Sequence, residues 1–247
     1  MTQDQAGKAI TENEATDPVE QLYLSLRRSG LPLNAQLEKI SAAIEQSDPR
    51  YARAYDRLVA RLKRIHAGES SPKKGEPMPG FLLPDENGHL VSLATLLERG
   101  PVVIAFLRGH WCPYCRLNAI GLAGIEAAIA PAQIVAISAQ TGQFAKSLRD
   151  ESGAHFPFLT DMDNGYAMSL GLSFALGADL SAMLYADACD IPTFQGSSDG
   201  WFLPIPAVFV VGSDGLIKER YVNPDFRQRM EIDALRIAVL AALAGDS

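Results

Sequence analysis

The feature that most constrains this chain is a pair of cysteines, two residues apart, at the junction between an apolar strand and a helix. Residues 102–107 (VVIAFL) have the composition of a buried parallel strand, and residues 113–130 are rich in Ala and Leu, as in a helix. Cys112 therefore falls near the helix N-cap, and Pro113 takes the first helical position, where its missing N–H is harmless. The unpaired amides and the dipole of a first helical turn stabilise a thiolate, so Cys112 and Cys115 are predicted to be nucleophilic.

The composition narrows the classes of function. The chain has 247 residues, of which 47% are hydrophobic, so it can bury a full core. A net charge of -7 without a long Lys or Arg run argues against nucleic acid or an anionic membrane as the partner. No apolar stretch approaches the ~18 residues needed to span a bilayer, and the N-terminus is polar, so we expect a cytoplasmic protein. Three cysteines are too few for a disulfide scaffold, which favours redox chemistry or metal binding.

The chain divides into four regions by periodicity and composition. Asp17-Pro18 and Asp48-Pro49 combine an N-cap residue with a proline, a pattern that predicts the start of a helix. Residues 68–79 are rich in Gly, Pro, Ser and Lys, as connectors are. The predicted regions are a disordered tail (1–16), an N-terminal helical extension (17–67), a linker (68–79) and a main domain (80–247).

The main domain alternates between strand and helix patterns. The predicted elements are a hairpin at 81–93, strands at 102–107, 133–138 and 156–159, helices at 113–130, 142–152 and 163–170, a hairpin at 208–222 and a helix at 225–244. This order predicts an α/β fold with a central mixed β-sheet flanked by helices. A segment at about 172–204 interrupts the pattern, and long insertions of this kind often cover active sites.

Several stretches of the main domain resemble the thioredoxin-like fold. More closely, they resemble the peroxiredoxin-like branch of the alkyl hydroperoxide reductase C and thiol-specific antioxidant superfamily. The stretches are the initial hairpin, 106–115 (FLRGHWCPYC), 156–161 (FPFLTD) and 203–207 (LPIPA). The resemblance covers roughly residues 76–244 and leaves the N-terminal extension outside.

The two resemblances imply different attacking sulfurs. Peroxiredoxins carry PxxxTxxC, which puts Cys115 at the peroxidatic position, Cys112 at the motif Thr, Arg108 at the motif Pro and Pro206 at a distant Arg. Thioredoxin-type reductases instead imply that Cys112 attacks and Cys115 resolves. In that case Pro206 is a cis-proline, and Ile205 before it lines the site.

The residues around the motif complete the predicted site. Arg108 and Arg116 bracket the cysteines, and the fixed charge of either one could stabilise a thiolate or a peroxide oxygen. Trp111 is expected to shield the site, and with Pro113, Tyr114 and Ile205 it makes up the predicted substrate-binding set. The predicted catalytic set is Cys112, Cys115, Pro206, Arg108 and Arg116.

Other thiols and imidazoles leave alternatives open. Cys189 could act as a resolving thiol, or pack as a small hydrophobe. His110 could lower a thiol pKa, or simply be a polar residue at the end of a strand. A structural zinc half-site would need Cys189 with His110 or His155, but the sequence has no second CxxC, so no metal is expected.

The resemblance implies a thiol peroxidase that reduces hydrogen peroxide or organic hydroperoxides. Its sulfenic acid would be resolved as a Cys112–Cys115 disulfide, and a thioredoxin-like or glutaredoxin-like dithiol would recycle it without a cofactor. The alternative enzyme is a thiol-disulfide oxidoreductase acting on protein disulfides. A third hypothesis is a redox-sensing module in which 17–67 docks a partner. The resemblance also allows a homodimer.

Overall fold

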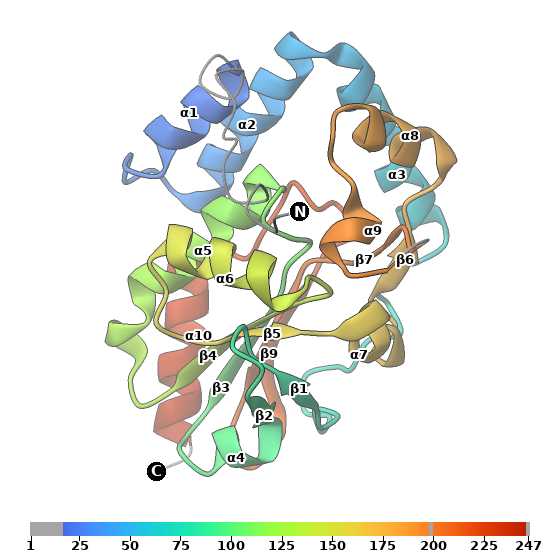
Figure 1. The fold of residues 1–247 in the computed structure, drawn as a ribbon. Coiled ribbons are helices and arrows are strands. Elements are labelled where there is room, and N and C mark those ends of the chain that lie inside the picture. The colour runs from blue at the N-terminus through green and yellow to red at the C-terminus, as the bar shows by residue number, and fades with distance from the viewer. Residues whose placement is uncertain (1–16, 198–199, 246–247) are drawn as a thin grey trace, which may run out of the picture.

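The computed structural model describes residues 17–197 and 200–245 (Figure 1). The expected tail at 1–16 lies outside the described residues. The centre of the molecule is a five-stranded mixed sheet in the order β5-β4-β3-β8-β9. Its strands are β3 (Val102–Phe106), β4 (Gln133–Ser138), β5 (Phe158–Thr160), β8 (Ala207–Val211) and β9 (Ile217–Val222). The expected α/β fold with a central mixed sheet is confirmed.

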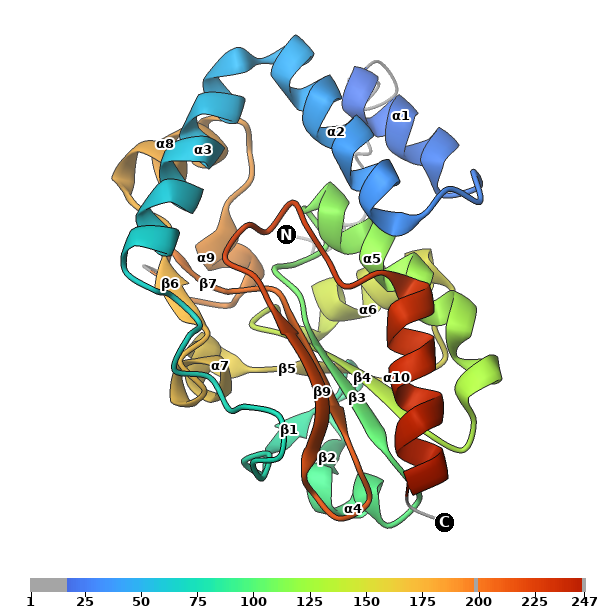
Figure 2. The same ribbon diagram turned by 180° about the vertical axis from the view of Figure 1, so that it is seen from behind.

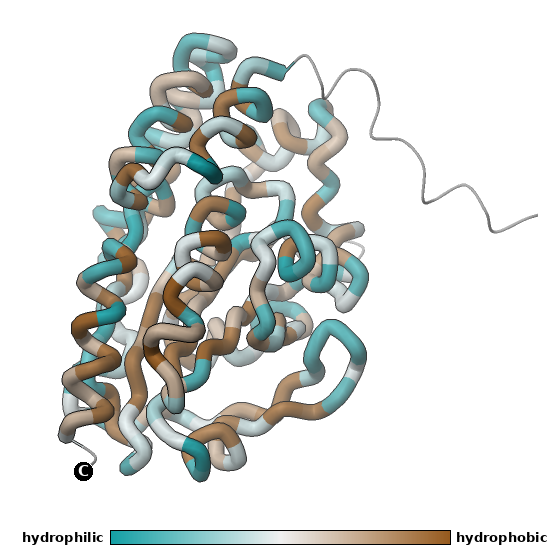
Figure 3. The backbone as a smooth tube through the Cα atoms, turned by 90° about the vertical axis from the view of Figure 1, so that its left-hand side faces the viewer, coloured by the Kyte–Doolittle hydropathy of each residue, from teal (hydrophilic) through white to brown (hydrophobic). Residues whose placement is uncertain are grey.

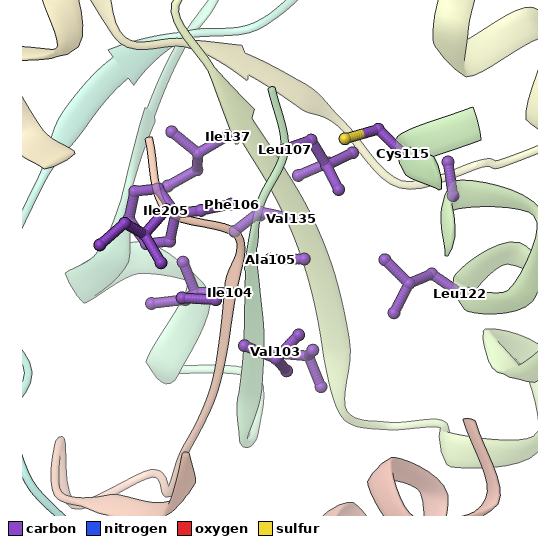
Figure 4. Close-up of a cluster of buried hydrophobic side chains, with 14 of the residues drawn as sticks. Val103, Ile104, Ala105, Phe106, Leu107, Cys115, Leu122, Val135, Ile137 and Ile205 are labelled. Carbon is purple, nitrogen blue, oxygen red and sulfur yellow. The ribbon is translucent and has the colours of Figure 1, made fainter. Parts of the chain in front are cut away.

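Strand β3 occupies the middle of the sheet because every one of its residues is apolar. It pairs in parallel with β4 and antiparallel with β8, and all five of its residues are buried. Successive side chains point to opposite faces. In Figure 4, Ala105 and Leu107 lie on the same side as Cys115, whereas Phe106 lies on the other side with Ile205.

Helices cover both faces of this sheet (Figures 1 and 2). One face carries α5 (Pro113–Ile125), α6 (Gly142–Ser152) and α10 (Ile232–Gly245), which pack on one another and on the strands. On the other face, Tyr166 of α7 (Gly165–Ser169) stacks on Phe106 with ring centroids 5.9 Å apart. The expected first hairpin is formed by β1 (Leu82–Pro84) and β2 (Leu90–Ser92), and the short helix α4 (Leu93–Leu97) follows it.

Three helices precede the sheet: α1 (Pro18–Leu26), α2 (Leu33–Ser47) and α3 (Pro49–Arg64). The two predicted caps form, since the Asp17 carboxylate accepts the Val19 N–H at 2.8 Å and the Asp48 carboxylate accepts the Arg50 N–H at 2.9 Å. In Figure 3 the tube alternates between hydrophilic and hydrophobic along the helices, whereas the sheet strands are mostly hydrophobic. Amphipathic helices of this kind bury one face, here against α5 and one another.

The segment at 68–79 follows α3 and runs along the edge strand β9. The N–H groups of Gly75 and Met78 donate to the carbonyls of Ile217 and Gly215, at 2.8 Å and 3.0 Å. The Met78 side chain is buried. These contacts attach the predicted linker closely to the β9 hairpin.

The segment that interrupts the pattern has its own structure. Two short strands, β6 (Ser173–Ala175) and β7 (Phe202–Pro204), pair antiparallel, and α8 (Ala178–Ala186) and α9 (Ile191–Phe194) lie between them. Figure 1 places α8 beside α3. The Tyr51 hydroxyl of α3 donates to Asp187 at 2.6 Å, so this segment and the extension meet.

The sequence prediction was wrong at the last helix. Helix α10 begins at Ile232, not Asp225, and 223–231 form an irregular loop. The side chains of this loop bind its own backbone, as when Asn223 accepts the Asp225 N–H at 2.9 Å and Asp225 accepts the Arg227 N–H at 3.2 Å. Such local bonds compete with a helical ladder. In the described parts of the chain, no helix combines the length and the apolar character required to cross a membrane.

Candidate redox site

The two cysteines lie where strand β3 gives way to α5. Cys112 is the N-cap residue of α5, with φ −95° and ψ 110°, and Pro113 follows at the first helical position, as predicted. The Cys112 carbonyl accepts the N–H groups of Cys115 and Arg116 at 2.9 Å and 3.0 Å. Both motif sulfurs are fully buried.

The turn before the motif requires a glycine at 109. Gly109 has φ +149°, a conformation that favours glycine. A Cβ there would lie 2.6 Å from Trp111 Nε1 and 2.8 Å from the Gln140 side chain. This close approach lets the chain turn from the strand end into the cysteine motif.

Cys115 is the better stabilised thiolate of the pair. Its sulfur accepts the Arg108 backbone N–H at 3.3 Å and lies 3.6 Å from Nη2 of Arg229. Burial by itself would raise the pKa of Cys115. The hydrogen bond from Cys112, the charges of Arg229 and Arg108, and the Arg108 N–H outweigh burial and hold that pKa well below its usual range.

Cys112 behaves in the opposite way. Burial raises the pKa of the Cys112 thiol well above its usual value, and the hydrogen bond that it shares with Cys115 raises it further. The charge of Arg108 opposes these effects without overcoming them. The opposite shifts of the two pKa values favour a protonated Cys112 thiol that donates to a Cys115 thiolate.

Arg108 is buried without a conventional partner. Its side chain is only 3% exposed, and Nε and Nη1 have no hydrogen-bond acceptor among the described residues. The guanidinium carbon lies 3.8 Å from the centre of the Phe226 ring and 4.9 Å from that of Trp111. Aromatic faces partly offset the loss of hydration. The N–H groups at Nε and Nη1, which have no acceptor among the described residues, can donate to an incoming anion or to a developing negative charge.

A cavity of about 480 Å³ lies next to Arg108. The motif side contributes Arg108, Trp111, Pro113 and Tyr114, while the extension and the α8 segment contribute mainly Val19, Ile44, Tyr51, Tyr55, Leu184 and Cys189. Neither motif cysteine is part of this wall, so the two sulfurs lie behind the side chains that line it. The carboxylates of Asp17, Asp48 and Asp187 also line the cavity. Its mainly apolar wall around one buried cation is typical of a small-molecule site.

Arg229 was not predicted from the sequence as a site residue. It belongs to the 223–231 loop that was expected to be helical, and its side chain is buried against Cys115. Phe226 of the same loop packs edge-on against Tyr114, with ring centroids 5.6 Å apart. No local spacing rule connects this loop to residue 115, because the contact spans 114 positions.

Arg116 is placed apart from the sulfurs. Its guanidinium binds Glu20 of α1 at 2.6 Å and Glu151 of α6 at 2.5 Å, and lies 3.7 Å from the centre of the Tyr23 ring. Two carboxylates thus compensate its charge. In this position Arg116 connects α1 to α5 and α6.

Ile205 is also placed apart from the cysteines, and the bond between Ile205 and Pro206 differs from the expectation. The peptide bond between them is trans; the described residues have one cis bond, Ala130–Pro131. The expected cis-proline is therefore absent. Ile205 is fully buried on the sheet face opposite Cys115 (Figure 4), where its side chain packs beside Gly68.

The imidazole of His110 points away from the thiols. Its Nδ1 accepts Nε2 of Gln140 at 2.6 Å, and its ring stacks on Phe144 with centroids 4.8 Å apart. Burial is the main cause of a lowered pKa for His110, so the ring is neutral at neutral pH. It therefore brings no positive charge to the cysteines.

Cys189 borders the cavity as a half-buried thiol. Burial is the main reason that its pKa rises to about 12, so it is protonated at neutral pH. Among the described residues there is no group of three or more His, Cys, Asp or Glu side chains arranged to hold a metal ion. The geometry around the motif is that of a dithiol next to two buried arginines.

Comparison with known proteins decides the family. Residues 74–220, more than half of the chain, match the model of the AhpC/TSA family. The chain belongs to the AhpC/TSA family. The resemblance read from the CxxC motif and its flanking strands is thereby confirmed. No match was found among curated proteins.

Solved structures agree on the fold. The peroxidoxin BcpB from Mycobacterium tuberculosis has 22% identity and a TM-score of 0.53, with 71% of this chain and 98% of that chain covered. A cysteine-to-serine variant of peroxiredoxin 6 of Arenicola marina has 16% identity and a TM-score of 0.53, with 68% and 72% covered. These similarities confirm the peroxiredoxin-type, thioredoxin-like fold. Arg229 and the extension lie outside the residues matched by the family model.

Proposed function

We propose that this protein is a thiol peroxidase in which the Cys115 thiolate attacks a hydroperoxide. The observation that carries the proposal is the placement of the Cys115 sulfur beside the Arg108 N–H and Arg229 Nη2, at 3.3 Å and 3.6 Å. A thiolate is the nucleophilic form of cysteine, and the surroundings of Cys115 lower the pKa of its thiol and so favour that form. AhpC/TSA family membership supports this class of chemistry.

The first step breaks the O–O bond of the peroxide. The Cys115 sulfur attacks the terminal oxygen, an S–O bond forms, and the remaining oxygen leaves as an alkoxide or hydroxide that takes up a proton. Arg108 lines the cavity, and because its Nε and Nη1 have no acceptor among the described residues, its guanidinium can donate to that oxygen as its charge develops. The products are a Cys115 sulfenic acid and an alcohol or water.

The second step uses the neighbouring thiol. The Cys112 sulfur attacks the sulfur of the Cys115 sulfenic acid, and the hydroxyl group leaves as water with a proton. The resulting Cys112–Cys115 disulfide is reduced by two electrons and two protons from an external dithiol protein of the thioredoxin or glutaredoxin type. A cytoplasmic location and the absence of a cofactor are part of the same proposal.

Burial of both sulfurs favours a peroxide over a protein disulfide as the substrate. A protein disulfide must approach the attacking sulfur closely, and neither motif sulfur is exposed. A peroxide is small enough to enter the cavity beside Arg108, and from there it needs a much smaller opening between the lining side chains to reach Cys115 than a protein disulfide does. We therefore place thiol-disulfide exchange with proteins second.

The test is peroxide consumption by the reduced protein and two variants. The wild type should consume hydrogen peroxide or an alkyl hydroperoxide far faster than a free thiol does, and Cys115→Ser should abolish this. Cys112→Ser should retain a single turnover and accumulate a sulfenic acid on Cys115, detected by mass spectrometry after dimedone trapping. Wild-type consumption no faster than that of a free thiol, or sulfenic acid on Cys112 in the Cys115→Ser variant, would contradict the proposal.

A further inference from the structure

The second cation at Cys115 is supplied by a loop that another part of the chain holds in place. Arg229 lies between β9 and α10, and its Nη1 donates to the carbonyls of Phe226 and Gln228. These bonds fix the guanidinium to its own loop. The position of Nη2 near the Cys115 sulfur therefore depends on where the loop backbone lies.

The loop backbone is bound by one side chain of the N-terminal extension. Asn34 Oδ1 accepts the Arg229 N–H at 2.9 Å, and Asn34 Nδ2 donates to the Arg229 carbonyl at 2.8 Å. A single amide thus satisfies both backbone polar groups of the residue whose side chain reaches the thiolate. No other residue type presents a donor and an acceptor in this spacing except glutamine, whose side chain is one methylene longer.

A reciprocal contact joins the same two segments. Helix α2 has Pro32 at its N-cap and no side-chain cap of its own. The Glu231 carboxylate takes that role, accepting the N–H groups of Leu33 and Asn34 at 3.0 Å and 2.9 Å, and also Nδ2 of Asn34 at 2.8 Å. A carboxylate at a helix N-terminus is favourable on both hydrogen-bonding and dipole grounds.

We propose that Asn34 is a positioning residue, which fixes Arg229 against the Cys115 sulfur and so makes the N-terminal extension part of the redox site. Both partners lie outside residues 74–220, so the family match does not include this contact. The inference rests on the proposed function for its effect on turnover. Its effect on the ionisation of Cys115 can be measured without any peroxide.

The competing explanation is that Asn34 merely holds the extension to the domain. In that case its removal lowers stability without changing the charge around Cys115. Arg108, from the end of β3, and Cys112, from the start of α5, also act on the Cys115 sulfur. Their contributions stay the same if only Arg229 moves, so the change measured at Cys115 isolates the Arg229 contribution.

The test is the thiolate titration of Cys115 in variants that also carry Cys112→Ser, followed by ultraviolet absorbance of the thiolate. Asn34→Ala should raise the midpoint by about one pH unit, the effect expected when an opposite charge within a few ångströms is displaced. Arg229→Met should give at least the same shift. Asn34→Ala should then add nothing in the Arg229→Met background, because the two changes act through one contact.

Gln36→Ala is the matched control, since it removes an amide from the same first turns of α2 that donates only to the Leu31 carbonyl at 2.7 Å. It should leave the midpoint unchanged. Asn34→Gln keeps the amide but displaces it by one methylene, and it should shift the midpoint in the same direction. It replaces Asn34→Ala in the test if that variant does not fold. A midpoint that stays at the value of the Cys112→Ser parent in folded Asn34 variants, or a shift that adds fully to that of Arg229→Met, would overturn the proposal. Loss of peroxidase activity alone would bear on the proposed function instead.

Discussion

The sheet with α5 and the segments that flank it contribute different things to one site. Residues from β3 through α5 lie within the family match and supply both sulfurs and Arg108. Helices α1–α3 and the 223–231 loop lie outside it and supply Arg229 together with much of the cavity wall. The shared fold therefore determines where the sulfurs lie, and the flanking segments contribute strongly to the charge and shape around them.

Apolar packing holds both regions, and the flanking segments differ in the polar contacts that they add. The sheet is stabilised by dense apolar packing, with every residue of β3 and β8 buried. The flanking segments add discrete polar contacts, such as Arg116 with Glu20 and Arg227 with Asp56, at 2.6 Å and 2.7 Å. A polar contact can be removed by one substitution with little change in volume, so the contribution of the flanking segments can be altered separately.

The largest expected effect lies at the strand-to-helix turn. Gly109→Ala should lower the free energy of unfolding by about 3 kcal/mol, because the added methyl group meets Trp111 Nε1 at 2.6 Å in a backbone conformation that alanine rarely adopts. Chemical denaturation of the reduced protein measures this loss. A loss of this size would show that the placement of the two cysteines after β3 depends on the turn at Gly109.

Gly124→Ala in α5 is the control for that substitution. Gly124 is exposed and a Cβ there meets nothing within 4 Å, so alanine should leave stability unchanged or raise it by up to about 1 kcal/mol. Equal effects of the two substitutions would show that the turn at Gly109 has no special demand for glycine.

Sequence reasoning succeeded where structure follows from neighbours along the chain. The caps at Asp17 and Asp48, the apolar strand β3 and the N-cap position of Cys112 each depend on a few consecutive residues. Binary pattern, proline position and capping chemistry act at that range. These rules also sufficed to place the two cysteines at the start of α5.

Prediction from the sequence failed where the residues in contact are far apart along the chain. The helix expected from Asp225 does not begin there, because local side-chain bonds compete with it and because Asn34, 195 positions away, binds the backbone of Arg229. Arg116 was assigned to the thiols by its proximity in sequence, yet the helix turns it toward Glu20 and Glu151. The residues that set the charge on Cys115 could not be identified without the tertiary contacts.

The titration of the two thiols gives the next largest effect and separates their roles. The pKa of Cys115 is held below its usual range, so its thiolate should persist to lower pH than that of an ordinary thiol, whereas the raised pKa of Cys112 should keep that thiol protonated to higher pH. In Cys112→Ser the thiolate absorbance should appear at a pH below the ordinary value of about 8.5, and in Cys115→Ser above it. The separation should exceed about one pH unit.

Serine is the suitable replacement in both variants, because its hydroxyl can still donate a hydrogen bond to the remaining sulfur. Each variant therefore removes one titrating thiol and keeps the hydrogen-bond donor. Peroxide consumption should follow the Cys115 titration, rising with pH through the same midpoint and then levelling off. If the Cys112 thiolate forms at the lower pH instead, the thioredoxin-type assignment of the attacking sulfur is the better one, and Arg229 has no part in activating it.

The smallest expected effect concerns the attachment of the extension. Glu20→Gln should lower the free energy of unfolding by about 1 kcal/mol, because the Glu20–Arg116 pair is partly buried, with side chains 28% and 16% exposed, and Arg116 keeps Glu151 as a partner. Asp150→Asn is the matched carboxylate-to-amide control, since its pair with Lys146 is exposed and should contribute almost nothing. Thermal unfolding measures both.

The Cys115 titration should stay at the wild-type midpoint in Glu20→Gln. The Glu20–Arg116 contact attaches α1 to the domain without touching Arg229, whereas Asn34 both attaches the extension and binds the backbone of Arg229. A shifted titration would mean that the whole extension, and not the Asn34 contact in particular, places the charge at the thiolate.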